Sequence, residues 1–299
     1  MDYSTVLAHL HECGLKVDMA ITDGLLHRAP TLSKPRSKNG WYICFENALV
    51  VGDWMTGVTQ TFTSGAKKKM SKYDWQHIKA KVEQEKLKLE QKQDDAALLA
   101  NNIYACSIVK TDFFKYLDKK QIRPTRDMRF YWNEQPSRYE LIIPLVDLST
   151  GEICNIQRIT EDGDKRFLAG GRVKGLCFPV GLNEQPSKVY ICEGVATATS
   201  IHQHLQAPVL AALNAGNLKA IAIQARLLWP DVDLIIAADD DHLAELKTGR
   251  NTGLMKAYDA SQETLASVSA PPFTDEQKLA GLTDWNDYFC LVNKQGRAA

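Results

Sequence analysis

The chain has 299 residues, which is enough for two domains and a sizeable buried core. Its composition is 44% hydrophobic and 24% charged, and no apolar run approaches the ~20 residues of a membrane span, which argues against a membrane-inserted protein. Lysine plus arginine and aspartate plus glutamate both number 36, so no global positive field favours nonspecific binding of nucleic acid. Any contact with nucleic acid must come from a local patch.

The N-terminus and the cysteines point to the cytoplasm. The opening stretch MDYSTVLAHLHECG lacks a basic region followed by an apolar core, so we expect neither a signal peptide nor an anchor. The seven cysteines lie far apart, with no CxxC pair and no clustering with histidine. This spacing favours reduced, mostly buried thiols and argues against a zinc ribbon.

The first third of the chain is predicted to be a small β-rich unit at residues 1–71 and a helical connector at residues 72–110. The stretch SKPRSKNGWYICFENALVVGDWMTG has the alternation and the Asn-Gly and Gly-Asp turns of short strands. From about Lys72 to Ala105 the sequence is highly charged and has few aliphatic residues. It therefore predicts one solvated helix, stabilised by Glu/Lys pairs three and four residues apart.

A second region, residues 111–186, is predicted to be a small α+β subdomain. FFKYLDKKQIRP predicts a short helix that ends before Pro124, and YELIIPLVDLSTGEICNIQRI predicts two strands separated by the turn STGE. The next stretch, EDGDKRFLAGGRVKG, combines Asp-Gly and Gly-Gly turns with basic side chains. These basic residues are Lys165, Arg166, Arg172 and Lys174.

The last region, residues 187–299, alternates strands of about five apolar residues with helices. The pattern runs from KVYIC through APVLAAL and VDLIIAA to a weak strand around SVSAPP, with a polar loop after the third strand. It predicts parallel βαβ units and hence an α/β fold with a doubly wound sheet. Ligands of such sheets gather outside the carboxyl ends of the strands.

Carboxylates follow two of these predicted strands. Glu193 comes directly after VYIC, and Asp239, Asp240 and Asp241 come directly after LIIAA. In an extended backbone Asp239 and Asp241 face the same way, whereas Asp240 turns towards solvent or stands behind the site. Capping and turn formation are the common roles of a lone aspartate here, but this combination with Glu193 suits Mg²⁺ or Mn²⁺. Gly194 and the small residues after it would offer backbone N–H groups to an anion.

The blocks VYICEGVATATSIHQ, APVLAALNAGNL, VDLIIAADDDH with NTGLMKA, and LTDWNDYF resemble a Toprim domain of the plasmid and phage DNA primase type. The family has Glu-Gly after its first strand and Asp-x-Asp after its third, which match Glu193-Gly194, Asp239 and Asp241. The resemblance implies that these three acids hold a divalent metal for phosphoryl transfer. It also implies Asp287 as a further ligand and Asp284 behind it, although capping of the last helix by Asp284 and solvent exposure of Asp287 remain equally open.

The resemblance continues upstream. Residues 139–181 are similar to the segment before the Toprim domain in bacterial-type primases, and FFKYLDKKQIRP is similar to His-Pro-Tyr-Leu-x-x-Lys-Gly-Ile, with Phe-Lys in place of His-Pro. This implies that Lys165 and Arg166 lie beside the metal and face phosphates, with Arg172 and Lys174 as weaker candidates. Solvation of a β-turn is the alternative for each.

Aromatic and basic residues of the first region could form a surface for single-stranded DNA, although core packing is the commoner role of such aromatic side chains. These residues are Trp41, Tyr42, Trp54, Trp75, Lys67, Lys68 and Lys69.

The sequence therefore predicts a metal-dependent, primase-like nucleotidyltransferase that makes short RNA primers on single-stranded DNA from nucleoside triphosphates, in plasmid or phage replication. Neither a zinc ribbon nor the helicase pattern GxxxxGK[ST] occurs, so a separate helicase or zinc-binding replication protein is an expected partner. Two alternatives stay open at this point. One is a Toprim nuclease that uses the same acids, and the other is a non-catalytic DNA-binding accessory protein of replication or conjugation.

Overall fold

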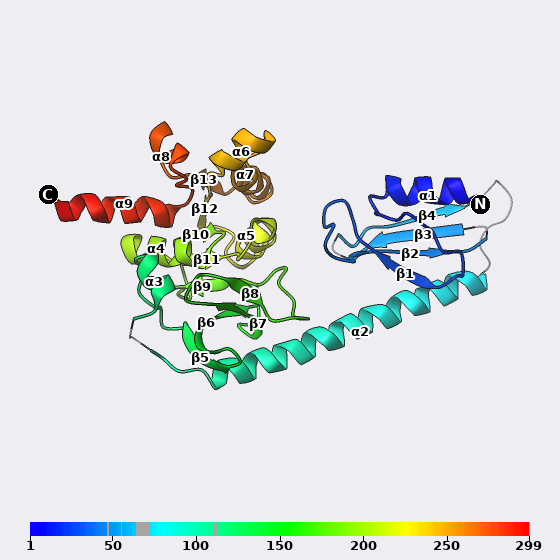
Figure 1. Cartoon of the computed structure of the whole chain (residues 1–299), viewed down its shortest axis with the longest axis horizontal. Helices are drawn as coiled ribbons and strands as arrows, with labels where there is room; N and C mark the ends of the chain where they lie inside the picture. The colour runs from blue at the N-terminus through cyan, green and yellow to red at the C-terminus, as the bar shows by residue number, and fades with distance from the viewer. Residues whose placement is uncertain (47, 55, 64–71, 111–112, 299) are drawn as a thin grey trace. The chain divides into compact units, whose positions relative to one another are not determined.

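The computed structural model describes residues 1–46, 48–54, 56–63, 72–110 and 113–298 (Figure 1). The chain forms two compact units, Met1–Glu90 and Gln91–Ala299. Among the described residues, no helix combines the length and the hydropathy that crossing a membrane requires.

The first unit is a four-stranded antiparallel sheet in the order β1-β2-β3-β4, with helix α1 (Tyr3–Glu12) packed on one face. Its strands are β1 (Leu26–Ala29), β2 (Gly40–Cys44), β3 (Ala48–Asp53) and β4 (Thr59–Thr63). Trp41 and Tyr42 alternate across β2 and are each 3% exposed, so both belong to the core and not to a DNA-binding surface. Lys67, Lys68, Lys69 and the side chain of Trp75 lie outside the described residues.

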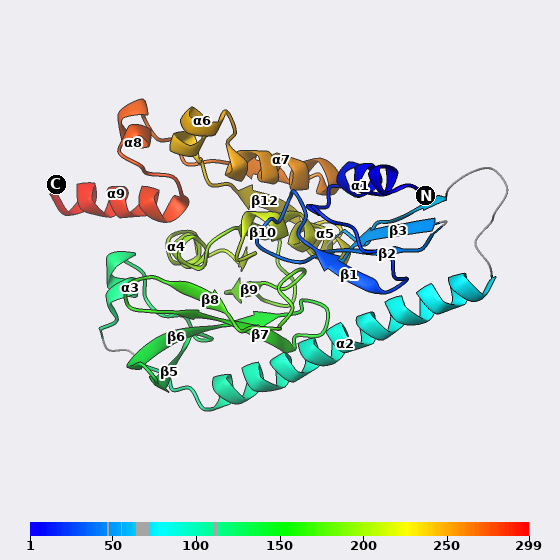
Figure 2. The ribbon, with the colours of Figure 1, turned by 45° about the vertical axis from the view of Figure 1, so that its right-hand side comes forward.

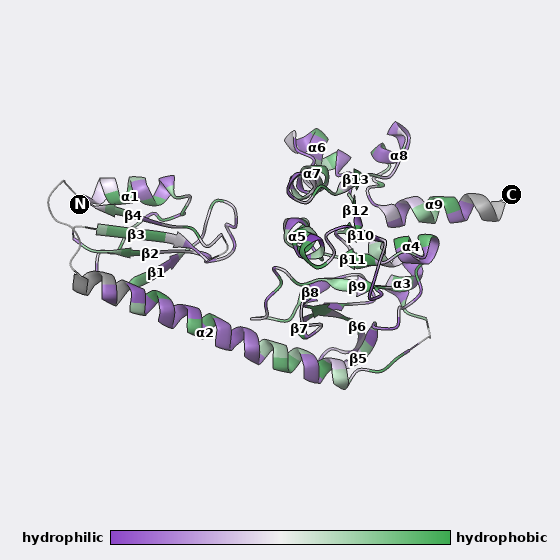
Figure 3. Ribbon diagram, turned by 180° about the vertical axis from the view of Figure 1, so that it is seen from behind, coloured by the Kyte–Doolittle hydropathy of each residue, from purple (hydrophilic) through white to green (hydrophobic). Residues whose placement is uncertain are grey.

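The charged stretch forms a single helix, α2 (Lys72–Ala105), as the sequence predicts. Hydrophilic residues dominate most of its length, and hydrophobic residues gather towards its C-terminal end (Figure 3). There Ala100 is fully buried against Ile142 and Ile156 of the second unit's antiparallel sheet. The second half of α2 is therefore part of the packed structure of this unit.

That antiparallel sheet has the order β5-β6-β7-β8 and is preceded by the short helix α3 (Lys115–Lys119). Its strands are β5 (Arg129–Glu134), β6 (Ser137–Val146), β7 (Ile153–Ile159) and β8 (Lys165–Phe167). The patterns of β6 and β7 are evident in the sequence, whereas β8 lies in a stretch that predicts only turns. Lys165, Arg166 and Phe167 become a strand because they pair with β7, a tertiary contact that overrides the turn signals around them.

The C-terminal sheet has the order β13-β12-β10-β11-β9, and its first four strands are parallel. These strands are β13 (Ser267–Ser269), β12 (Asp233–Ala237), β10 (Lys188–Cys192) and β11 (Val209–Ala211), with β9 (Phe178–Val180) antiparallel at the edge. The predicted doubly wound α/β sheet is thus confirmed, with one antiparallel strand added from the segment that precedes it.

Helices cover both faces of this sheet. Figures 1 and 2 show α5 and α7 on one side of β10 and β12, and α4 and α9 on the other. The helices are α4 (Val195–Leu205), α5 (Leu218–Leu228), α6 (His242–Thr248), α7 (Thr252–Thr264), α8 (Asp275–Leu279) and α9 (Trp285–Ala298). The predicted polar loop after the third strand therefore contains a short helix, α6. The first seven residues of α4 are all buried, so the small side chains that open this helix serve close packing.

Candidate metal centre

Parallel pairing brings the carboxylates to one edge of the C-terminal sheet. Cys192 at the end of β10 pairs with Ala237 at the end of β12. Glu193 is the next residue after β10, and Asp239 follows β12 after one intervening residue. Gly194 stands at the N-cap of α4 with an ordinary extended backbone. The acids therefore lie where the sequence places them, at the carboxyl ends of neighbouring strands.

Asp239 is the most perturbed acid of this edge. Its Oδ1 atom is buried and has no hydrogen-bond partner among the described residues. Burial, together with the negative charges of neighbouring carboxylates, raises the pKa of Asp239 to about 8. These neighbours are Asp284, Glu193, Asp241 and Asp287.

Glu193 is subject to the same forces. Burial and then the charge of Asp241 raise the pKa of its carboxyl group, while a backbone hydrogen bond from Ala215 and the charge of Lys165 act in the opposite direction. Carboxylates that share a poorly solvated region repel each other until a proton or a cation reduces the charge. The edge of the sheet thus has a deficit of positive charge.

The donor chemistry of this cluster fits a divalent cation, since hard ions such as Mg²⁺ take oxygen ligands. As they stand, however, no three Asp, Glu, His or Cys side chains of the described ranges are arranged so that they could hold a metal ion. Two of the acids are turned to the backbone: Asp241 accepts a hydrogen bond from the N–H of Gly253 at 2.8 Å, and Asp287 accepts one from Thr283 at 3.1 Å. Repulsion between uncompensated carboxylates favours such separated positions.

The acids at the start of α9 combine two roles. Asp284 accepts a hydrogen bond from the backbone of Asp287 at 2.8 Å, which is the capping role that its sequence position allows. It also lies close enough to Asp239 to raise the pKa of that residue. Asp287 is half-buried, and one of its oxygens lies 3.7 Å from the ammonium group of Lys120, so it is not simply a solvent-exposed acid.

Asp240 turns away from this cluster, but it does not point into solvent. Its side chain is 7% exposed and forms an ion pair with Lys278 at 2.8 Å. Its other oxygen accepts a hydrogen bond from Asn251 at 2.8 Å. Burial alone would raise the pKa of Asp240, but the contacts with Lys278 and Asn251 outweigh it and lower that pKa. Of the two positions that the sequence allows for Asp240, solvent is therefore wrong.

The model of the Toprim domain family matches residues 188–295, the segment that carries all of these acids. This segment of the chain is a Toprim domain. Two Escherichia coli proteins, each described as DNA primase TraC, are similar to it. One is 28% identical over 267 residues, which are 86% of this chain and 18% of that protein. The other is 36% identical over 135 residues, which are 44% of this chain and 12% of that protein.

The chain therefore spans less than a fifth of the length of these curated relatives. Among solved structures, the primase fragment of the bacteriophage T7 primase-helicase protein is 14% identical, with a TM-score of 0.46. This alignment covers 64% of the present chain and 76% of that one. The family match and the two relatives confirm the resemblance to Toprim proteins of the DNA primase type.

Strand alternation separates two of the basic residues that the sequence groups beside the Toprim acids. Lys165 pairs with Ile159, whose side chain belongs to the core shared with the Toprim sheet, whereas Arg166 pairs with Arg158 on the opposite face. Lys165 is exposed when the residue is taken as a whole. Protein atoms around its ammonium group nevertheless exclude part of the surrounding water, and this partial burial, together with the charge of Lys120, lowers the pKa of Lys165. The charges of nearby Asp284, Glu193 and Asp239 act in the opposite direction, so Lys165 lies within their electrostatic reach.

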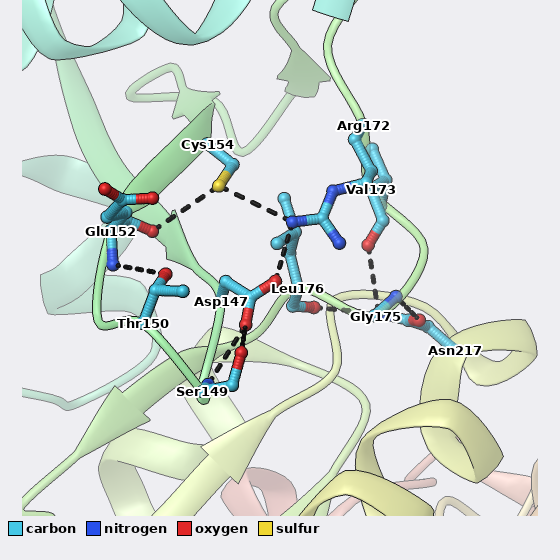
Figure 4. Close-up of polar contacts among 10 residues, drawn as sticks. All are labelled: Asp147, Ser149, Thr150, Glu152, Cys154, Arg172, Val173, Gly175, Leu176 and Asn217. Atoms are coloured by element: carbon cyan, nitrogen blue, oxygen red, sulfur yellow. Dashed lines mark hydrogen bonds and ion pairs between the residues drawn. The ribbon is translucent and has the colours of Figure 1, made fainter. Parts of the chain in front are cut away.

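Arg172 is committed to a contact within the antiparallel subdomain (Figure 4). Its guanidinium group lies 2.8 Å from Asp147 and 3.6 Å from the sulfur of Cys154. Hydrogen bonds from Arg172 and Ser149 lower the pKa of Asp147 to about 2. Lys174, two residues later, is exposed at the surface of the same loop. This geometry gives Arg172 a structural task and leaves Lys174 as the more accessible cation.

Sequence reasoning missed three residues that shape the Toprim site. Lys120 lies beside Asp287, and its position in YLDKKQI matches the lysine of the primase pattern quoted above, which could have revealed it. Asn251 caps α7 and contacts both Asp240 and the backbone of Asp241. Gly253 lies so close to Asp239 that a Cβ atom there would stand 2.3 Å from the Asp239 carbonyl oxygen.

The ion pair of Asp240 predicts a measurable loss of stability. Replacing Asp240 by alanine should lower the free energy of unfolding by about 2–3 kcal/mol, because it leaves Lys278 and Asn251 without their buried acceptor. Asp240→Asn keeps an acceptor for Asn251 and should cost less. Because the pKa of Asp240 is lowered in the folded state, its contribution is present above its ordinary pKa and is lost as the pH falls. Urea unfolding at pH 7 and below the ordinary pKa of Asp240, at about pH 3, measures both effects. Equal stabilities of wild type and Asp240→Ala at pH 7 would contradict the assignment.

Proposed function

We propose that this protein is a metal-dependent, primase-like nucleotidyltransferase that synthesises short RNA primers on single-stranded DNA, in the cytoplasm, during plasmid or phage replication. The observation that carries the proposal is the buried, unpartnered oxygen of Asp239 among four further carboxylates at the edge of a Toprim sheet. Similarity to DNA primase TraC over 86% of the chain supports this choice among Toprim activities.

In this proposal Glu193, Asp239, Asp241 and Asp287 hold Mg²⁺ or Mn²⁺, and Asp284 supports them from the start of α9. The bound ion would neutralise phosphate charge and align the reacting groups. The chain's own contribution is to concentrate carboxylates where burial makes their negative charge costly, so that binding a cation is favoured over solvation.

The cations around the acids would bind the phosphates of nucleotide or template. Lys165 is the first candidate because Glu193, Asp239 and Asp284 all act on its charge, and Lys120 joins it from the segment after α3. Lys174 and the backbone at Gly194 are further candidates. Arg166 lies on the other face of its strand, and Arg172 pairs with Asp147, so we assign both a weaker role in phosphate binding.

Single-stranded DNA and nucleoside triphosphates are the proposed substrates, and a separate helicase or zinc-binding replication protein is a proposed partner. The test incubates the protein with end-labelled single-stranded DNA, ribonucleoside triphosphates and Mn²⁺. New RNA of a few nucleotides, dependent on both template and metal, is the expected result. Shortened DNA would instead identify a Toprim nuclease. DNA binding that survives chelation of the metal, without either product, would identify a non-catalytic accessory protein.

A further inference from the structure

Asn217 is a fully engaged polar side chain in the interior of the second unit. It ends the short 3₁₀ turn Ala215–Asn217 that follows β11, and it is 2% exposed. Its amide nitrogen donates to the carbonyl oxygens of Leu176 at 2.8 Å, Ala212 at 2.9 Å and Val173 at 3.3 Å. Its amide oxygen accepts from the N–H of Gly175 at 2.8 Å (Figure 4). One side chain thus joins the end of β11 to the loop that carries Lys174.

The same turn also holds Glu193. The N–H of Leu213 donates to the Glu193 carbonyl oxygen at 2.7 Å, and the backbone of Ala215 donates to the Glu193 side chain. Leu213 has φ of 69°, in the left-handed region that costs a non-glycine residue about 1–2 kcal/mol, so the surrounding contacts fix the path of this turn. Residues 213–217 therefore contact a proposed metal ligand at one end and the Lys174 loop at the other.

The loop is fixed on its other side as well. Asn155, which is fully buried, donates to the carbonyl oxygen of Arg172 at 2.8 Å, and the Arg172 side chain pairs with Asp147. With Arg172 held at one end and Gly175 at the other, the backbone on both sides of Lys174 is restrained. A cation on such a restrained backbone loses less conformational freedom when it binds a phosphate than one on a free loop.

We propose that Asn217 is a positioning residue that fixes the Lys174 loop relative to Glu193, so that Lys174 reaches the phosphates of a nucleotide bound at the acidic edge. This inference rests on the proposed function. Its physical basis is that a single buried amide uses its hydrogen-bonding capacity to join the turn after β11 to the loop that carries Lys174, just beyond Ala211 and Phe178, the last residue pair of β11 and β9.

The test combines Asn217→Ala with Lys174→Met in primer synthesis. Lys174→Met alone should raise the KM for nucleoside triphosphate at least tenfold, with kcat reduced less than threefold. Asn217→Ala should raise the KM similarly. The KM of the double variant should be little higher than that of either single variant, because a Lys174 that is already misplaced contributes little binding energy for the second substitution to remove. If the two effects multiply, the residues act independently and the proposal is wrong. If Asn217→Ala does not fold, Asn217→Ser carries the same comparison.

A control and a second readout separate this inference from the proposed function. Thr264→Val removes another buried hydrogen bond, to the carbonyl oxygen of Ala260 at 2.8 Å, far along α7, and should leave the KM unchanged. Hydrogen exchange of the Gly175 amide needs no activity: it should be at least tenfold faster in Asn217→Ala than in wild type. Faster exchange in a protein that makes no primers would overturn the proposed function and the role of Lys174, but would still show that Asn217 holds the Lys174 loop. Unchanged exchange would show that Asn217 does not hold this loop.

Discussion

Asp239→Asn is expected to abolish primer synthesis and, at the same time, to stabilise the metal-free protein at neutral pH. Synthesis should fall more than a hundredfold, because the variant loses a ligand from the proposed metal site and the charge that this ligand carries. Stability should rise because aspartate must take up a proton on folding to avoid a buried negative charge among other carboxylates, whereas asparagine is neutral in both states. Opposite signs for activity and stability are typical of an acid retained for function.

The pH dependence gives this prediction its sharpest form. The pKa of Asp239 is raised from 3.8 to about 8, so between these values the folded protein binds a proton that the unfolded chain does not. Wild-type stability should therefore fall as the pH rises through this window, by about 1–4 kcal/mol by pH 7, and Asp239→Asn should lack this component. Urea unfolding between pH 5 and pH 8 in the presence of a chelator measures it. Identical pH slopes for the two proteins would contradict the assignment.

Added metal offers a readout that does not depend on catalysis. Mg²⁺ or Mn²⁺ should raise the unfolding temperature of the wild type and should do so much less in Asp239→Asn and Asp241→Asn. Asp233→Asn is the matched control, since Asp233 begins the strand β12 whose other end leads to Asp239. This variant should keep primer synthesis and the response to metal.

Gly253→Ala is expected to destabilise the protein by about 1–3 kcal/mol and to reduce primer synthesis at least tenfold. Alanine in place of glycine within a helix normally adds up to about 1 kcal/mol of stability. Here the added Cβ would stand 2.3 Å from the carbonyl oxygen of Asp239, and neither backbone can yield easily. Relief of the clash must displace Asp239 or the start of α7, whose Gly253 N–H also binds the Asp241 side chain. Small displacements of this kind are costly to catalysis.

Gly249→Ala separates this effect from the general cost of losing a glycine. Gly249 has φ of 71°, and nothing lies within 4 Å of the position that its Cβ would take. Its replacement should cost about 1–2 kcal/mol of backbone strain and leave primer synthesis near the wild-type level. Thermal unfolding and the primer assay on both variants make the comparison. A Gly253→Ala protein as stable and as active as the wild type would show that the close approach to Asp239 is unimportant.

Much of the fold is predictable because local patterns specify it. The charged run from Lys72 to Ala105 forms one helix, and the apolar strands of the C-terminal region become β10, β11 and β12. Such features depend on periodicity and turn residues within a few positions along the chain. The placement of Glu193 and Asp239 at one edge follows from parallel pairing alone.

The amino-acid sequence by itself thus determined the α/β class of the C-terminal region, its Toprim blocks and the acids at their strand ends. Only the tertiary structure decided which face each side chain occupies: Lys165 faces the acids while Arg166 does not, and Asp240 is buried against Lys278. It likewise brought Lys120 to Asp287, and tied that segment to α9 through a hydrogen bond that spans 166 positions in the sequence. The physical reason is that periodicity records the neighbours of a residue along the chain, whereas burial and charge pairing depend on neighbours that only folding brings together.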